Sequence, residues 1–329
     1  MTQTTYVRAV CDAVARAMQD DERVIVLGED VAEGGPYTAT AGLADAFGRE
    51  RVRNTPISES TVAGVAVGAA QAGYRPIVEI MFIDFVTLAL DQLANQGAKA
   101  RFMSGGQLSV PLVMRTQGGA GQRGGAQHSQ SLESWLAHIP GLKVVMPSTA
   151  VDAAGLMTSA IADPDPVVFV ESKALYFVRE EIEGEPPAVP LGVARTFREG
   201  TDLTIVATAR MVRRALEAAD VLAAEGIQAT VIDPRTLVPL DIDTITASVE
   251  VTNHLMVVEE AVTSMGFGAE IAAMVQHAAF DDLDAPVERV GAPFTPVPLS
   301  PGLEDAYIPD VDSIARAARR ILSLGAEAA

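Results

Sequence analysis

The segment PIVEIMFIDFVTLALDQLANQGAKARFMSGGQLSVPLVM, residues 76–114, contains the strand–helix–strand pattern that decides the fold class. Pro76–Ile80 and Val110–Met114 are short apolar runs typical of buried strands. Between them, Phe82–Met103 has apolar residues at helical spacing, and the following Gly105-Gly106 favours a helix stop. The segment therefore predicts two strands of a mostly parallel sheet joined by a helix.

The alternation of strand-like and helix-like patterns continues on both sides of this segment. It predicts two successive α/β domains, each with a mostly parallel sheet. In the first half, the apolar pattern predicts strands at Val24–Gly28, Lys143–Met146 and Val167–Val170, and helices at Ser60–Gln71 and Val151–Ala162. In the second half, it predicts strands at Leu203–Ala207, Ala229–Ile232 and Leu255–Val258, and helices at Val212–Ala224 and Ile242–Val249. The acidic, proline-rich stretch Glu180–Pro187 is the predicted linker, which gives domains at 1–186 and 187–329.

Charge and cysteine content exclude several classes of protein. The chain has 329 residues with 24 Lys+Arg against 43 Asp+Glu, a net charge of −19, which argues against a nucleic-acid or anionic-membrane surface. No stretch has the length of uninterrupted apolar residues needed to span a membrane, and Arg8, Asp12 and Arg16 break any signal-peptide core. The single cysteine excludes a disulfide framework and favours a reducing, cytoplasmic compartment.

The most unusual segment is the glycine-rich loop Gln117–Gln130, which follows a predicted strand. Ligands of α/β sheets bind beyond the carboxyl ends of strands, where this loop is expected, and His128 is its acid–base candidate. The loop matches neither the dinucleotide fingerprint nor the P-loop pattern. The alternative is a flexible loop with a structural histidine.

Three further segments have a functional and a structural interpretation. Glu59, at the start of a predicted helix, is either a ligand-binding carboxylate or a partner of the helix dipole. Met81–Phe85, at a strand end, either contacts a flat ring or belongs to the core. Asp163 and Asp165, beside a helix end, either hold a cation or simply accompany the helix stop.

In this order, the segments resemble one family over essentially the whole chain: the β subunit of the thiamine-diphosphate-dependent decarboxylating component of 2-oxo acid dehydrogenase complexes. The matching segments are Gly28-Glu29-Asp30-Val31, Thr55–Glu59, Asp91-Gln92, Ala98-Lys99, Gln127–Gln130, Pro140–Val145, Val231–Asp233, Gly266–Glu270 and Asp284–Val287. The resemblance implies a transketolase-like pyrimidine-binding domain followed by a transketolase C-terminal-type domain.

The resemblance also implies roles for individual residues. Glu59 corresponds to the family glutamate that hydrogen-bonds the aminopyrimidine of thiamine diphosphate, where a carboxylic acid favours the imino tautomer that generates the ylid. Met81 and Phe85 correspond to ring-contacting positions, and their identity favours the pyruvate type. His128 corresponds to the histidine that acts as proton donor or oxyanion stabiliser while the acyl group passes to lipoamide. The neighbouring Gln122–Gly125 stretch is expected to bear on substrate choice.

A monovalent-cation site is a further implication of the resemblance, with potassium as the expected ion. Such a site is built largely from carbonyl groups, and its matching positions are Leu112, Ala160, Ile161, Asp163 and Asp165. Position 165 is often Asn in relatives, so Asp165 departs from the pattern and adds a charge.

The sequence contains neither the Gly-Asp-Gly segment nor the Asn pair with which related enzymes hold the diphosphate through Mg²⁺. The resemblance therefore implies that an α subunit supplies Mg²⁺ binding, in a heterotetramer of two α and two β chains that is active only when both are present. A lipoyl acyltransferase and a small 2-oxo acid, with pyruvate favoured, are the other expected partners. The alternatives are an acetoin or branched-chain 2-oxo acid dehydrogenase β subunit, a self-contained transketolase-like enzyme, and a non-catalytic assembly subunit.

The negative charge is densest near the C-terminus. A stretch with a single arginine, Arg289, contains Asp281, Asp282, Asp284, Glu288, Glu304, Asp305, Asp310 and Asp312. In relatives, the C-terminal domain meets a commonly basic subunit-binding domain of the acyltransferase. The stretch is therefore expected either to steer that docking or to be a merely solvated acidic surface.

Overall fold

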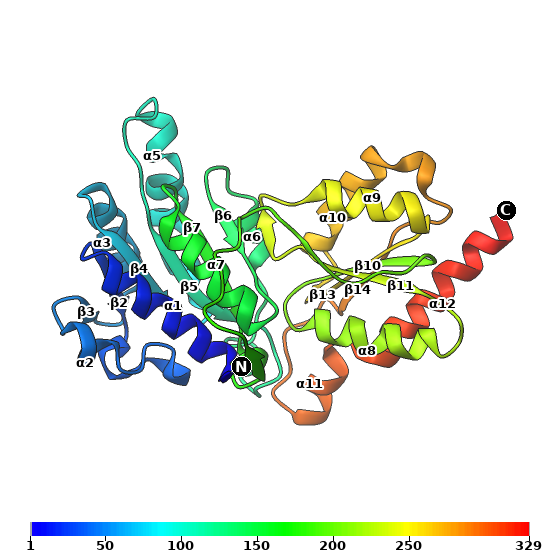
Figure 1. Ribbon diagram of the computed structural model, residues 1–329, viewed down its shortest axis with the longest axis horizontal. Helices are drawn as coiled ribbons and strands as arrows, with labels where there is room; N and C mark the ends of the chain where they lie inside the picture. Colours follow the sequence, from blue (N-terminus) through cyan, green and yellow to red (C-terminus); the bar gives the residue numbers. More distant parts are fainter. Residues whose placement is uncertain (1, 329) are drawn as a thin grey trace. The chain divides into compact units, whose positions relative to one another are not determined.

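The computed structural model describes residues 2–328, and the chain divides into two compact units (Figure 1). The first unit is Met1–Gly118 with Trp135–Leu191, and the second is Gly119–Ser134 with Gly192–Ala329. The glycine-rich loop therefore belongs to the second unit, although the sequence places it within a first domain of residues 1–186. The division falls after Leu191, close to the predicted linker.

The first unit is built on a parallel sheet whose strands follow the order β6-β7-β5-β4-β2-β3. Its strands are β2 (Val24–Gly28), β3 (Val52–Asn54), β4 (Arg75–Ile80), β5 (Val113–Gly118), β6 (Lys143–Val145) and β7 (Val167–Ser172). Most of these strands are buried along their length, which explains why they appear in the sequence as continuous apolar runs. The predicted parallel α/β architecture is confirmed.

Two helices, α1 (Tyr6–Asp20) and α7 (Ala150–Ala162), pack side by side in this unit (Figure 1). Each begins at a threonine whose hydroxyl accepts a backbone N–H, Thr5 from Arg8 and Thr149 from Asp152. Their small apolar residues share one core with the strands. Helix α1 was not among the predicted elements.

Helix α3 (Glu59–Gln71) packs on β4 and against the helical segment that follows β4. That segment consists of η3 (Ile83–Phe85), α4 (Val86–Asp91), the π-helical η4 (Gln92–Gly97) and α5 (Ala98–Met103). It corresponds to the predicted Phe82–Met103 helix, interrupted by one π-helical stretch. The shorter elements of the unit are η1 (Val31–Glu33), η2 (Pro36–Thr38), α2 (Leu43–Phe47) and η5 (Lys173–Leu175); α6 (Glu133–Ala137) straddles the boundary between the units.

Part of the predicted linker is a strand. β8 (Arg179–Ile182) pairs antiparallel with β1 (Thr2–Thr5), with Thr4 opposite Glu180. The pairing uses backbone groups, so the charged side chains of this segment do not prevent it. The acidic, proline-rich composition thus indicated a connection but concealed a strand.

The second unit has a five-stranded sheet in the order β14-β13-β10-β11-β9, in which only β9 pairs antiparallel. Its elements are β9 (Arg195–Arg198), β10 (Leu203–Ala207), β11 (Ala229–Asp233), β12 (Thr236–Val238), β13 (Leu255–Val262), β14 (Glu288–Ala292), α8 (Met211–Ala223), α9 (Ile242–Thr252), α10 (Phe267–Ala278), η6 (Phe280–Asp282), α11 (Pro301–Tyr307) and α12 (Val311–Ala328). Helices α8 and α12 pack together on one face, while α9 and α10 cover the other (Figure 1). Among residues 2–328, no helix is both long enough and apolar enough to cross a membrane.

Candidate active site

Glu59 is the first residue of α3, where the N-terminus of the helix favours a negative side chain. Its side chain is nearly buried, with 8% of the residue exposed, and its carboxylate has no hydrogen-bond partner among the described residues. The nearby Glu29 has a raised pKa because of burial and the negative charges of Glu59 and Asp30. A nearly buried carboxylate without a protein partner is suited to hydrogen-bond a ligand.

The segment Met81–Phe85 forms a tight turn at the carboxyl end of β4. Phe82 adopts a left-handed conformation with φ of 69°, and its ring meets that of Phe85 edge-on at a centroid distance of 6.3 Å. The Nζ atom of Lys173 lies 5.0 Å from the centroid of the Phe82 ring. Met81 and Phe85 are half-buried. Both predicted ring contacts therefore lie in the same unit as Glu59, on a turn with constrained geometry.

Gln117, a buried residue of β5, connects this turn to a buried charge cluster. Its Oε1 accepts a hydrogen bond from the backbone N–H of Phe82 at 2.9 Å, and its Nε2 donates to Oε1 of Glu79 at 2.9 Å. Glu79 also accepts from Arg115 at 3.0 Å, and Arg115 donates to both carboxylate oxygens of Glu171 at 2.7 and 3.0 Å. Glu79, Arg115 and Glu171 were not among the site residues predicted from the sequence, and Gln117 was predicted only as the first residue of the glycine-rich loop.

The charge cluster of Arg115, Glu79 and Glu171 is almost entirely removed from water, with 3% or less of each residue exposed. Burial raises the pKa of Glu79. Burial alone disfavours the charged form of Arg115, but the carboxylates of Glu171 and Glu79 outweigh this effect and raise the Arg115 pKa. The arginine therefore neutralises part of the negative charge beneath the turn.

His128 lies in the second unit and is partly exposed. Its backbone N–H donates to the carbonyl of Gly125 at 3.4 Å, and the base of the loop is closed by a hydrogen bond from Gly119 N to Gln130 O at 3.0 Å. The structure thus groups Glu59, Met81 and Phe85 in one unit and places His128 in the other.

The predicted acidic C-terminal surface needs correction at several positions. Glu304 is completely buried and accepts hydrogen bonds from the loop, Asp305 pairs with Arg123, and Glu288 pairs with Arg320. Helix α11 folds Glu304 inward, which the local sequence did not reveal. The exposed acidic residues that remain in this stretch are Asp281, Asp284, Asp310 and Asp312, together with the paired Asp305.

Two other buried carboxyl groups in the second unit have strongly raised pKa values. Burial raises the pKa of Glu133 to about 8, with contributions from Glu259 and Glu260, and raises that of Glu259 to about 7. One carboxyl oxygen of each, Oε2 of Glu133 and Oε1 of Glu259, is buried without a hydrogen-bond partner among the described residues. Glu133 therefore changes charge near neutral pH.

Replacing Glu133 with glutamine should flatten the pH dependence of stability. Because the folded-state pKa of about 8 exceeds the ordinary 4.5, this group's contribution to the unfolding free energy is complete below pH 4.5 and is lost as the pH rises through 8. Thermal unfolding should show that Glu133→Gln melts above the wild type at about pH 8, while the two differ less at about pH 5. The exposed Glu217→Gln is the control; parallel melting curves for Glu133→Gln and wild type contradict the expectation.

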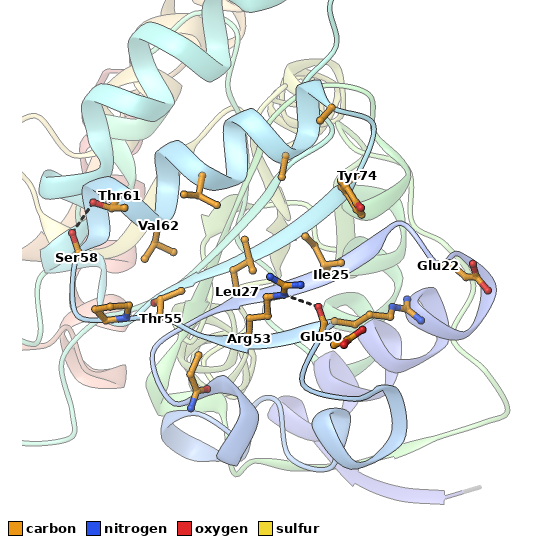
Figure 2. Close-up of a pocket in the computed structure, with 16 residues that line it drawn as sticks. Glu22, Ile25, Leu27, Glu50, Arg53, Thr55, Ser58, Thr61, Val62 and Tyr74 are labelled. Atoms are coloured by element: carbon orange, nitrogen blue, oxygen red, sulfur yellow. Dashed lines mark hydrogen bonds between the residues drawn. The ribbon is translucent and has the colours of Figure 1, made fainter.

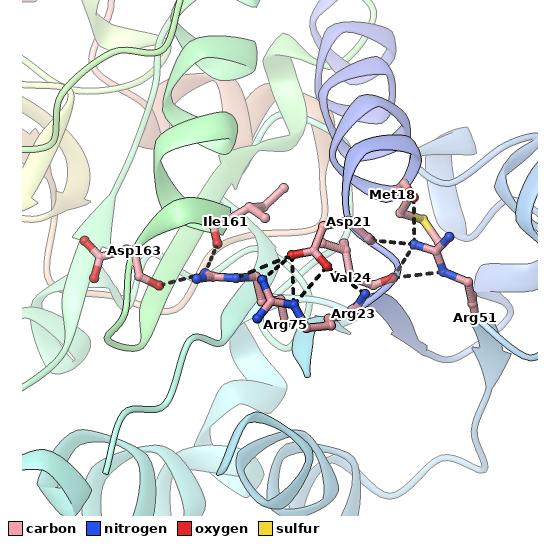
Figure 3. A network of polar contacts seen from close by, with 8 residues as sticks. All are labelled: Met18, Asp21, Arg23, Val24, Arg51, Arg75, Ile161 and Asp163. Atoms are coloured by element: carbon pink, nitrogen blue, oxygen red, sulfur yellow. Dashed lines mark hydrogen bonds and ion pairs between the residues drawn. The ribbon is translucent and has the colours of Figure 1, made fainter. Parts of the chain in front are cut away.

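The five predicted cation-site positions lie in the first unit around the end of α7, and protein groups already engage them. Figure 3 shows Arg75 extending to the carbonyl oxygens of Ile161 at 2.7 Å and Asp163 at 3.4 Å. The carbonyl of Leu112 accepts from Val167 N, and that of Ala160 accepts from Asp163 N.

The two carboxylates at this site are also paired. Lys143 donates to both oxygens of Asp163 at 2.7 and 2.6 Å, and Arg101 donates to Asp165. The extra charge of Asp165 is thus balanced without a metal ion. A potassium ion at these positions has to share its carbonyl oxygens with Arg75, and it stays a prediction.

A pocket of about 790 Å³ lies beside α3, near β2 and β3 (Figure 2). Thr55, Pro56 and Ser58 line it, and Ser58 donates to Oγ1 of Thr61 at 2.9 Å. Glu59, Met81 and Phe85 are not among the lining residues. The pocket therefore neighbours Glu59 along the chain but does not contain the predicted ring contacts. The described residues include no cluster of three or more His, Cys, Asp or Glu arranged to hold a metal ion.

Both halves of the chain match known domains. Residues 2–178 match the transketolase pyrimidine-binding domain, and residues 192–314 match the transketolase C-terminal domain. A solved structure described as a split-gene transketolase, an inactive beta4 tetramer, superposes with a TM-score of 0.81 at 25% identity, covering 97% of this chain and 98% of that one. The fold and the two matches define a transketolase-like protein.

Relatives refine this class. The chain is 48% identical to the beta subunit of the acetoin:2,6-dichlorophenolindophenol oxidoreductase of Bacillus subtilis, with 93% of each chain covered. It is 46% identical to the mitochondrial pyruvate dehydrogenase E1 component subunit beta-2 of Oryza sativa subsp. japonica, with 97% of this chain and 86% of the relative covered. The chain therefore belongs to the family of E1 β subunits of 2-oxo acid and acetoin dehydrogenases.

Proposed function

We propose that this chain is the β subunit of a thiamine-diphosphate-dependent 2-oxo acid dehydrogenase that decarboxylates pyruvate and transfers the acyl group to the lipoamide of a partner acyltransferase. The observation that carries the proposal is Glu59, a nearly buried residue at the start of a helix in a pyrimidine-binding domain, whose carboxylate has no hydrogen-bond partner in the described part of the chain. Family membership supports it, because relatives with 45–48% identity are named as pyruvate dehydrogenase or acetoin enzyme β subunits.

When bound, thiamine diphosphate supplies the electron sink for decarboxylation. Glu59 fits a hydrogen bond to the aminopyrimidine nitrogen, because the residue is nearly buried and its carboxylate has no hydrogen-bond partner among residues 2–328. Met81 and Phe85 present half-buried side chains for contact with the flat ring, on a turn fixed by Gln117. His128 donates a proton or stabilises negative charge during acyl transfer.

The proposal includes partners that complete the enzyme. The chain has no Gly-Asp-Gly segment or Asn pair to bind Mg²⁺-diphosphate, so an α subunit supplies that half in a heterotetramer of two α and two β chains, and the β chain alone is inactive. A lipoyl acyltransferase accepts the acyl group, and the exposed Asp281, Asp284, Asp310 and Asp312 of the acidic C-terminal stretch steer its docking, whereas Asp305 is paired with Arg123 and has no part in it. The remaining predictions are a cytoplasmic location and a potassium ion at Leu112, Ala160, Ile161, Asp163 and Asp165.

Acetoin is the second candidate substrate, because two relatives with 48% identity are named as β subunits of an acetoin:2,6-dichlorophenolindophenol oxidoreductase. The test is to co-purify the chain with its α subunit and compare kcat/KM for pyruvate, 3-methyl-2-oxobutanoate and acetoin, with dichlorophenolindophenol as electron acceptor. We expect pyruvate to give the highest value. A higher value for acetoin or the branched-chain acid overturns the substrate assignment, and a stable α–β assembly inactive on all three indicates a non-catalytic subunit.

A further inference from the structure

Carboxylates of the second unit hold the backbone of the glycine-rich loop. Ala120 N donates to Glu260, and Gly121 N donates to Oε1 of Glu304 at 2.9 Å. The backbone N–H of Arg123 lies 3.2 and 3.3 Å from the two carboxylate oxygens of Glu304. Gly121 and Arg123 therefore share the carboxylate of Glu304, while Ala120 bonds to that of Glu260, and both anions are side chains of the same chain.

The local geometry of the loop depends on these carboxylates. Gly119 has φ of +88°, and a Cβ atom there would lie 2.7 Å from Oε1 of Glu260, so a side chain at this position would strain the backbone and displace the Glu260 carboxylate. The glycines therefore let the backbone approach buried carboxylates. The N–H groups of Ala120, Gly121 and Arg123 already bond to protein carboxylates and are not free to bind a phosphate.

Both carboxylates are firmly placed by the second unit. Glu260 is on β13, and its Oε1 accepts a hydrogen bond from Nη2 of Arg210 at 2.9 Å; both residues are buried. Glu304 is fixed by its burial on α11, where it is 0% exposed, and its carboxylate also accepts a hydrogen bond from Nη1 of the loop residue Arg123 at 2.6 Å. Hydrogen bonds to a buried charged acceptor are stronger than those between neutral groups. The loop is thus attached at its beginning to two elements that follow it by more than 130 residues.

We propose that Glu304, together with Glu260, is a positioning residue for His128. The anchored residues 119–123 and the closing hydrogen bond from Gly119 N to Gln130 O define the two ends of the segment that carries His128. Loss of the Glu304 carboxylate releases the first end, and His128 then samples orientations that do not serve acyl transfer. This inference rests on the role of His128 in the proposed function.

The test compares Glu304→Gln with Asp305→Asn in the complex with the α subunit. Asp305 is a matched control, because it is next to Glu304 on α11 but is exposed, and its carboxylate pairs with the guanidinium of Arg123 rather than with the backbone of the loop. Hydrogen exchange of the 119–130 segment should accelerate roughly ten- to a hundredfold in Glu304→Gln and stay unchanged in Asp305→Asn. If Glu304→Gln fails to fold, Glu304→Asp keeps the charge, shortens the reach and should show a smaller acceleration.

A second readout separates positioning from general damage. Glu304→Gln should reduce acyl transfer to lipoamide more than it reduces decarboxylation measured with dichlorophenolindophenol. His128→Asn should show the same preferential loss of acyl transfer, while Asp305→Asn should change neither rate. Unchanged hydrogen exchange, or an equal loss of both half-reactions, overturns the proposal. A wild-type complex that decarboxylates none of the substrates overturns the proposed function instead, and the exchange data still decide whether Glu304 holds the loop.

Discussion

Glu59→Gln, assembled with the α subunit, should lose 2-oxo acid decarboxylation by a factor of about 10²–10⁴. Glutamine keeps the shape of the side chain but cannot exchange a proton with the aminopyrimidine, so the cofactor is not activated. The loss should appear in kcat, and the variant should keep the assembly and the melting temperature of the wild type. Decarboxylation and assembly are measured on the same preparation.

The matched control for this variant is Glu270→Gln. Glu270 is also an acidic residue in the first turn of a helix, α10, but it is exposed. Its replacement removes a charge at a helix N-terminus that has no role in the chemistry. The expected loss of unfolding free energy is about 0.3–1 kcal/mol. Near-normal turnover of Glu59→Gln rules out the catalytic assignment, whatever the control shows.

Arg115→Met should destabilise the protein by about 3–5 kcal/mol, because it leaves the carboxylates of Glu79 and Glu171 buried without their cation. The turn that carries Met81 and Phe85 should loosen as well, since Gln117 connects it to Glu79. Chemical unfolding of the complex measures the first effect. The affinity for thiamine diphosphate measures the second.

Arg49→Met is the control for Arg115→Met. Arg49 pairs with Glu33 at 2.8 Å, but its side chain is 68% exposed, so its loss should cost no more than about 1 kcal/mol. If Arg115→Met does not fold, adding Glu79→Gln and Glu171→Gln should restore folding by removing the uncompensated charges. Equal stability of Arg115→Met and Arg49→Met contradicts the expectation.

The parts of the fold that local sequence could predict are those stabilised by local apolar patterns. Strand Val24–Gly28 has the predicted bounds, and α3 and α7 each begin one residue before the predicted start. Strand β5 begins at Val113 and runs into the glycine-rich segment, because Arg115 and Gln117 are buried by partners on neighbouring strands. Polar residues in a strand are recognised as buried only when those partners are known.

The same limit applies to the site. Glu59, Met81 and Phe85 could be proposed as site residues because they fall on short motifs of the family that the sequence resembles. Glu260 and Glu304 could not, because they meet the loop across more than 130 residues of chain. A signal existed for the charge cluster: Glu79 and Arg115 are register partners on adjacent strands, and Glu171 is on the next strand. A charge in each of three consecutive sheet strands indicates a buried ion cluster.

The membership of Gly119–Ser134 in the second unit has a consequence for how the chain folds during synthesis. These residues are synthesised long before Glu260 and Glu304. The backbone N–H groups of Ala120 and Gly121 therefore have no access to their final acceptors until those residues have been added. Contacts of such long sequence separation form late, because closing the intervening chain costs conformational entropy. A fragment that begins at Gly192 lacks this segment altogether. The two units therefore cannot be separated by cleaving the chain at the linker. The second unit is complete only with Gly119–Ser134, which lies in the sequence between the two parts of the first unit.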